Sequence, residues 1–230
     1  MHYRLEAATV KVLIIAPHMD DEVLGCGGTI AKHVSQGHIV SVCVVANRAY
    51  GHKYDEELIA VEKQAAKAAK EILGYERLIF LDLPDEQLDS KLIDVIVPLE
   101  ALLLEIKPDI VYVNHRGDVN QDHQAVFKAA MVACRPIAAH QIHKILAYEV
   151  PSSTDQSPPF EEVTFIPNYY VDITLFLEKK IQALSCYQRE ARLFPHPRSP
   201  EGIRIYAQKR GMEIGFQAAE AFAVIRDQWK

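Results

Sequence analysis

The stretch from Ala16 to Gly28, A-P-H-M-D-D-E-V-L-G-C-G-G, decides the fold and raises the question of function. It follows directly on the apolar run at residues 12–16, which is typical of a strand buried on both faces of a sheet. One histidine and three acids therefore follow directly after the C-terminal end of a predicted buried strand. Charged groups are costly to gather near a core unless something compensates them, and a bound cation would do so.

Strand-like and helix-like segments alternate on either side of this stretch. Strands are expected at residues 12–16, 39–46, 78–81, 110–113 and 145–150, and helices at residues 23–36, 56–73, 92–106 and 124–134. This alternation indicates βαβ units, and hence an α/β fold with a mostly parallel sheet. The crossovers should be right-handed, and a ligand crevice should lie at the carboxyl ends of the strands.

The last third of the chain has a different character. Residues 151–167 carry four prolines and are expected to form a loop or lid, and residues 194–200 a rigid polar turn. Helices are expected at residues 175–187, 200–211 and 215–222, with Lys179 and Lys180 on an exposed face. We predict one domain over residues 1–230, with a core over about 1–150 and a lid and C-terminal extension over about 151–230 packed on it.

Composition narrows the classes of function. The chain has 230 residues, 49% of them hydrophobic, which is enough for one globular domain with a real core. A net charge of −6 predicts no general attraction to nucleic acid. The absence of a leader and of a long apolar run predicts no membrane span and a cytoplasmic setting. The four cysteines are scattered, without a C-x-x-C pair, and are expected to be reduced.

A second polar motif, N-H-R-G-D-V-N-Q-D-H, runs from Asn114 to His123 and also follows a predicted strand. His18 and Asp21 stand three residues apart and face the same side of a helical turn. If the two strands are neighbours, His18, Asp21 and His123 can converge on one point. Two imidazoles and one carboxylate suit a catalytic zinc site with a position left for water. The alternative is a hydrogen-bonded cluster that only braces two loops.

Asp20 is the spare carboxylate of this group. A bound zinc ion lowers the pKa of its water to about 7. Asp20 could take a proton from that water and pass it to a leaving amine. Together these steps are the chemistry of amide hydrolysis.

The motif P-H-M-D-D-E after the first strand, with the later D-H, resembles the PIG-L/LmbE-like zinc-dependent N-acetylglucosamine deacetylases. The resemblance covers most of the chain and is strongest at residues 12–28 and 114–136. It implies a Rossmann-like three-layer sandwich, with Zn²⁺ or another divalent metal held by His18, Asp21 and His123 and with Asp20 as general base. It also implies hydrolysis of an N-acetylated amino sugar or sugar conjugate, with release of acetate, and an enzyme that can form a homo-oligomer.

The sequence departs from the family pattern at one position. Many members carry a second histidine three residues before the metal-binding histidine, and it stabilises the oxyanion; here that position is Asn120. The role then passes to Asn120, to the metal itself, or to His196 in the stiff P-H-P-R-S loop.

Other polar residues are candidates for contact with the substrate or the ligands. Arg48, His115 and Arg135 are expected to bind substrate, and Arg198 is a weaker candidate of the same kind. Asp118 and Asp122 are expected to lie behind the ligands or to brace loops. Asp122 could orient a ligand imidazole or cap the following helix.

Two other functions compete with a deacetylase. Two histidines and one carboxylate also suit a mononuclear iron(II) oxygenase, although the strand–helix alternation argues against it. The second rival is a non-catalytic sugar- or nucleotide-binding module with a structural metal. The glycines at residues 25–28 mimic a dinucleotide fingerprint, but their spacing is wrong, and tight packing of a helix on the sheet explains them better.

Overall fold

A seven-stranded sheet runs through the molecule in the order β3-β2-β1-β4-β5-β7-β6. The computed structural model describes residues 9–49, 52–136 and 142–229. The strands are β1 (Lys11–Ala16), β2 (Ile39–Asn47), β3 (Arg77–Pro84), β4 (Ile110–Asn114), β5 (Lys144–Tyr148), β6 (Tyr169–Asp172) and β7 (Ala219–Asp227). The helices are α1 (Asp21–Ser35), α2 (Glu56–Leu73), α3 (Ile93–Ile106), α4 (Gln121–Ala133), α5 (Leu177–Leu184) and α6 (Pro200–Met212), with a short 3-10 turn η1 (Thr154–Gln156).

Strands β1 to β5 run parallel to one another, as the alternation predicts. From β1 the sheet grows through β2 and β3 on one side and through β4 and β5 on the other. In parallel sheets, ligands bind outside the carboxyl ends of the strands where the strand order reverses in this way. Both polar motifs leave the sheet at this point, because one follows β1 and the other follows β4.

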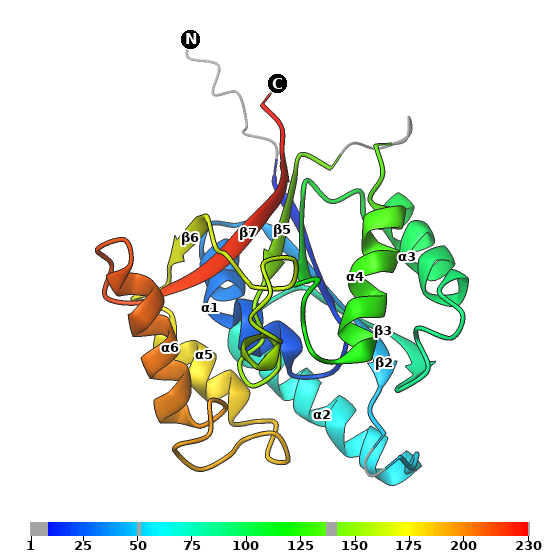
Figure 1. The fold of residues 1–230 in the computed structure, drawn as a ribbon, viewed down its shortest axis with the longest axis horizontal. Helices are drawn as coiled ribbons and strands as arrows, with labels where there is room; N and C mark the ends of the chain where they lie inside the picture. Colours follow the sequence, from blue (N-terminus) through cyan, green and yellow to red (C-terminus); the bar gives the residue numbers. More distant parts are fainter. Residues whose placement is uncertain (1–8, 50–51, 137–141, 230) are drawn as a thin grey trace.

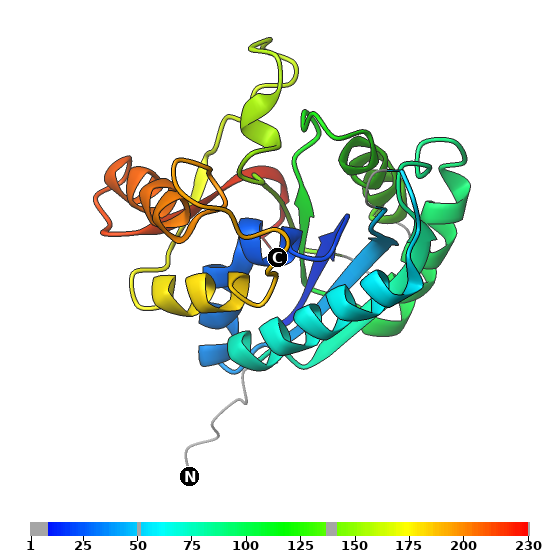
Figure 2. The same cartoon turned by 90° about the horizontal axis from the view of Figure 1, so that it is seen from below.

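Helices cover both faces of the sheet and make three layers: in Figure 1 and Figure 2, α3 and α4 lie on one side of the strands and α1, α5 and α6 on the other. Alternate residues of β1 point to opposite faces. Val12 and Ile14 pack in one core with α1, α2, α5 and α6, and Leu13 and Ile15 pack in the other with α3 and α4. All four side chains are fully buried, which explains why the strand is apolar from Val12 onward.

The predicted elements between residues 12 and 212 are confirmed in type, and none of their ends shifts by more than three residues. Helix α2 illustrates why. Its first turn is capped by the Asp55 side chain, which accepts a hydrogen bond from the Leu58 amide, and it ends at Gly74 with φ of 85°. Within the described part of the chain, no helix has both the length and the apolar character needed to cross a membrane.

The expectation of a helix over residues 215–222 is wrong. Strand β7 lies between β5 and β6 and is antiparallel to both. The alanines of this segment favour a helix locally, but pairing on both edges overrides that preference. The partner strand β6 is also absent from the predicted elements, because four residues are too short to show a clear alternation.

Two glycines allow α1 to lie directly against its neighbours. A Cβ atom on Gly25 would come within 2.1 Å of the Tyr148 ring, and one on Gly28 within 2.7 Å of Ile173. These glycines therefore serve close packing and not a dinucleotide, as expected. The four cysteines are free, with Cys186 half-buried and the others buried, which agrees with the prediction of reduced thiols.

The expectation that Lys180 lies on an exposed helix face is wrong. Its Nζ lies 2.6 Å from Oε1 of Glu220 and donates to the Leu24 carbonyl oxygen at 2.8 Å. Glu220 also accepts hydrogen bonds from the amides of Gly28 and Thr29, at 2.9 and 2.7 Å. In an uninterrupted helix the Gly28 amide would donate to the Leu24 carbonyl. The buried ion pair thus fastens α5 and β7 to the middle of α1.

We predict that Lys180→Met destabilises the protein by about 3–5 kcal/mol, because it leaves the buried Glu220 carboxylate without its cation. Urea unfolding followed by circular dichroism measures this change. Lys179→Met is the matched control, since it removes the neighbouring lysine, and it should change the free energy of unfolding by less than about 0.5 kcal/mol. Equal effects of the two substitutions would contradict the assigned role of the pair.

Candidate metal centre

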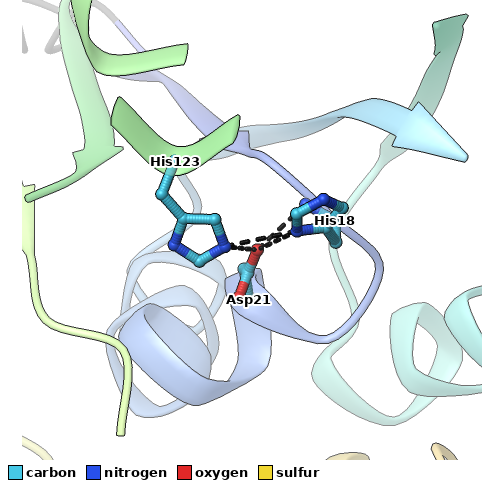
Figure 3. A group of neighbouring side chains, drawn as sticks. All are labelled: His18, Asp21 and His123. Carbon is cyan, nitrogen blue, oxygen red and sulfur yellow. Dashed lines mark hydrogen bonds and ion pairs between the residues drawn. The ribbon is translucent and has the colours of Figure 1, made fainter. Parts of the chain in front are cut away.

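Three potential ligand atoms meet at the carboxyl ends of β1 and β4 (Figure 3). Nδ1 of His18 lies 3.2 Å from Nε2 of His123 and 3.5 Å from Oδ2 of Asp21. His123 Nε2 lies 3.2 Å from the same Asp21 oxygen. His18 follows β1, Asp21 opens α1, and His123 lies in the first turn of α4. The fold therefore brings the three predicted ligands together, and all three are buried.

The spacing of these atoms fits a divalent metal ion. Zinc binds histidine nitrogen and carboxylate oxygen at about 2.0–2.2 Å, so neighbouring ligands of a tetrahedral ion stand about 3.3–3.5 Å apart. The three observed separations span 3.2–3.5 Å. The second oxygen of Asp21 is buried and has no hydrogen-bond partner among the described residues. Such a set also leaves a coordination position for water.

Each imidazole has a carboxylate behind it. His18 Nε2 lies 2.7 Å from Oδ1 of Asp85, and His123 Nδ1 lies 3.0 Å from Oδ2 of Asp118. Such partners fix the ring and direct the other nitrogen toward a metal. Asp118 thus lies behind a ligand, as expected, whereas Asp85 is missing from the sequence-based candidates. Its signal in the sequence is its position directly after β3, at the same edge of the sheet.

Asp122 lies 3.5 Å from His18 Nε2 and, with Asp85, forms a second group that could hold a cation. Its oxygens already accept hydrogen bonds from two backbone amides of the loop after β3, so it braces that loop. Of the two roles predicted for Asp122, the helix cap is wrong, because the side chain of Asn120 caps α4. The role of orienting a ligand imidazole agrees with its place beside His18.

The charges of the cluster favour a cation. Burial lowers the pKa of His123, but attraction to Asp21 and contact with Asp118 outweigh it and raise the pKa to about 9. Burial also lowers the pKa of His18, yet its hydrogen bonds to the surrounding carboxylates raise the pKa well above its usual value. Without a metal, the surrounding acids therefore favour the protonated form of an imidazole over the neutral form. A divalent ion can take the place of this positive charge.

Asp20 stands beside the ligands with one free carboxylate oxygen. It is fully buried, and its φ of 105° is a conformation that strains a non-glycine backbone. Arg198 Nη1 donates to Oδ2 at 2.8 Å, whereas Oδ1 has no hydrogen-bond partner in the described part of the chain. Burial raises the pKa of Asp20 to about 8, against the opposing effect of Arg198.

A cleft of about 460 Å³ opens beside the metal centre, a size that suits a small ligand. It is lined by His18, Arg48, Ala49, His52, Asp85, Glu86, Asn120, Gln121 and Asp122. Two residues predicted to act on the substrate, Arg48 and Asn120, therefore face the same space. The carboxamide oxygen of Asn120 accepts from the first amides of α4, so Nδ2 is the group left to donate.

Three other predicted residues lie away from this lining. Arg135 follows the C-terminal end of α4 and pairs with Glu100. His115 is buried edge-on against the Phe165 ring, with 5.2 Å between the ring centroids. The ring of His196 accepts a hydrogen bond from a backbone amide two residues further on. The fold thus places Arg48 and Asn120 on the cleft beside the candidate metal centre and these three residues outside its lining.

Comparison with known proteins agrees with this geometry. Residues 13–134 match the family PIG-L, described as GlcNAc-PI de-N-acetylase. The chain is 35% identical over 147 residues to the uncharacterized deacetylase YaiS of Escherichia coli, covering 62% of this chain and 75% of that protein. It is 28% identical over 189 residues to the diacetylchitobiose deacetylase of Thermococcus kodakarensis, covering 78% and 70%.

A solved structure extends the likeness of fold to nearly the whole chain. The 4-carboxy-2-hydroxymuconate hydratase GalB of Pseudomonas putida matches with a TM-score of 0.75 and 21% identity, covering 96% of this chain and 98% of that one. That protein is a hydratase with a similar fold, so the fold alone does not determine which reaction a protein of this shape catalyses. The sequence match spans every ligand of the metal centre, and the chain belongs to the PIG-L (GlcNAc-PI de-N-acetylase) family.

Proposed function

We propose that this protein is a metal-dependent N-deacetylase that acts on an N-acetylated amino sugar or sugar conjugate and releases acetate. The observation that carries the proposal is a three-ligand centre beside a separate buried carboxylate, Asp20, with one oxygen unpartnered among the described residues. A structural zinc site would be closed by four protein ligands. The deacetylase relatives and the family description support the same reaction and substrate class.

The roles follow from the atoms available. A bound divalent ion supplies Lewis-acid activation of the amide carbonyl and of water. Asp20 accepts the proton of the attacking water at Oδ1 and delivers it to the amine nitrogen as the C–N bond breaks. Zinc suits two imidazoles and one carboxylate, although other divalent ions share these ligands. We also propose that the protein acts in the cytoplasm, the setting expected from the sequence.

Two chain residues are proposed to face the substrate. Nδ2 of Asn120 can donate a hydrogen bond to the oxyanion that forms when water adds to the amide. Asn120 lines the cleft and His196 does not, which favours Asn120 for this role. Arg48 lines the same cleft and can hold sugar hydroxyls or an anionic part of a conjugate.

We predict that metal-stripped protein releases no acetate and that added zinc restores release with one ion bound per chain. The assay measures acetate from diacetylchitobiose, free N-acetylglucosamine, a nucleotide-linked N-acetylglucosamine and a simple glycoside. One tightly bound ion without acetate from any compound would contradict the proposal. In that case, hydration of 4-carboxy-2-hydroxymuconate would point to a hydratase, and no reaction at all would point to a binding module.

We predict that Asp20→Asn retains one zinc per chain but lowers kcat by about 10²–10⁴-fold, because the proton acceptor is lost while all three ligands remain. Metal analysis and steady-state kinetics measure the two effects. Asp89→Asn, which changes an exposed acid in the loop after β3, is the control and should match the wild type. A kcat for Asp20→Asn within tenfold of the wild type would remove Asp20 from the mechanism.

We predict that Asn120→Ser lowers kcat by about 10²–10³-fold, because the amide donor to the oxyanion is lost. Serine keeps a side-chain cap on α4, so the free energy of unfolding should change little. His196→Ala should leave kcat near the wild-type value. The reverse pattern, with the loss in His196→Ala, would transfer the oxyanion role to His196.

A further inference from the structure

The group that holds the Asp20 side chain comes from the last third of the chain. Arg198 lies in the connection between α5 and α6, and its Nη1 donates to Asp20 Oδ2 at 2.8 Å. The Arg198 side chain is 10% exposed and the Asp20 side chain 0%, so water screens this contact little. The stiff 194–200 loop was singled out in the sequence for its histidine, but it is the arginine of this loop that reaches the metal centre.

The guanidinium of Arg198 is itself fixed by further contacts. Nη1 also donates to Oε2 of Glu190 at 2.8 Å, and Nε donates to the Ser152 hydroxyl at 2.8 Å. Glu190 is buried and belongs to the same connection, whereas Ser152 belongs to the loop after β5. A planar guanidinium held by several acceptors loses little further freedom when it binds one more carboxylate. Arg198 therefore presents a rigid donor to Asp20.

The backbone of Asp20 is held from the same side of the molecule. Its amide donates to Oε2 of Glu22 at 3.1 Å, and Oε1 of Glu22 accepts from the Tyr187 hydroxyl at 2.5 Å. Glu22 therefore links the strained Asp20 backbone to the connection that follows α5. Its amide and Oδ2 are both engaged, whereas Oδ1 has no hydrogen-bond partner among the described residues.

We infer that Arg198 is the positioning residue for Asp20, so that the C-terminal extension completes an active site whose metal ligands lie elsewhere in the chain. The inference rests on the proposed function, because it assigns Asp20 the work of a base. Without the guanidinium, the Asp20 carboxylate would be buried beside Asp21, a like charge, with no cation to hold it. It would then turn away from its productive orientation.

The test compares Arg198→Ala with Arg210→Gln. Arg210 belongs to the same extension, and its side chain is 12% exposed and paired with Glu149. Arg198→Ala should lower kcat by about 10²-fold, the cost of a misplaced catalytic group, with KM and zinc content little changed. Guanidinium ion at non-denaturing concentration should restore part of the lost kcat. Arg210→Gln should keep the wild-type kcat, and Arg198→Ala with a wild-type kcat would overturn the inference.

A double variant separates action through Asp20 from a general effect on folding. In the Asp20→Asn background, Arg198→Ala should cause little further loss, because the group that it positions is already gone. Full additivity of the two losses would overturn the inference. If Arg198→Ala does not fold, Arg198→Lys replaces it, because lysine keeps the positive charge but lacks the planar guanidinium that donates to several acceptors at once. An unchanged kcat in Arg198→Lys would also overturn the inference.

Crystal structures of the wild type and the folded Arg198 variant give a readout that does not depend on activity. Asp20 should turn from its wild-type orientation when the guanidinium is absent, and an unmoved Asp20 would overturn the inference. If the wild type releases no acetate, the proposed function fails while this comparison still decides the role of Arg198. If the wild type is active and Asp20 does not move, the function stands and the inference fails.

Discussion

The structure depends on one electrostatic constraint: several carboxylates are buried together at the carboxyl ends of β1 and β4. Asp20, Asp21, Glu22, Asp118 and Asp122 are each at most 1% exposed. Buried charges of one sign repel one another and must be compensated. His18, His123 and Arg198 supply part of that compensation, and the divalent ion of the proposed function would supply more. The buried charges that would be destabilising without a cation are the same ones that form the candidate metal centre.

The surrounding fold is arranged to hold this cluster rigidly. Residues 12–16 of strand β1 are fully buried and anchor His18, while the glycines of α1 let that helix lie against Tyr148 and Ile173. The Lys180–Glu220 pair then ties α1 to α5 and β7. Helix α1 carries Asp21 at its first position, so each of these contacts also fixes a metal ligand. The short stretch of sequence that forms α1 therefore provides both the packing contacts and one of the proposed ligands.

The site divides between two parts of the chain. Residues 13–134, which match the family, carry the metal ligands, Asp20, and the carboxylates behind the histidines. The groups that contact Asp20 from outside that region are Arg198 directly and Tyr187 through Glu22. The part that matches the family therefore carries the proposed ligands, and the later part of the chain supplies the contact to the Asp20 side chain.

Sequence alone determined the α/β fold, the parallel core and the three side chains that meet at the ends of β1 and β4, because apolar runs, helix stops and closely spaced motifs are local patterns. It did not reveal strand β7, whose alanines favour a helix until β5 and β6 pair with it. The sequence-based prediction placed Lys180 on an exposed face, because no local pattern reveals that its buried partner Glu220 lies 40 residues away. Asp85 and Arg198 reach the centre through the sheet order and through a contact across 178 residues. Only the tertiary structure decided these contacts, since they depend on which distant segments pack side by side.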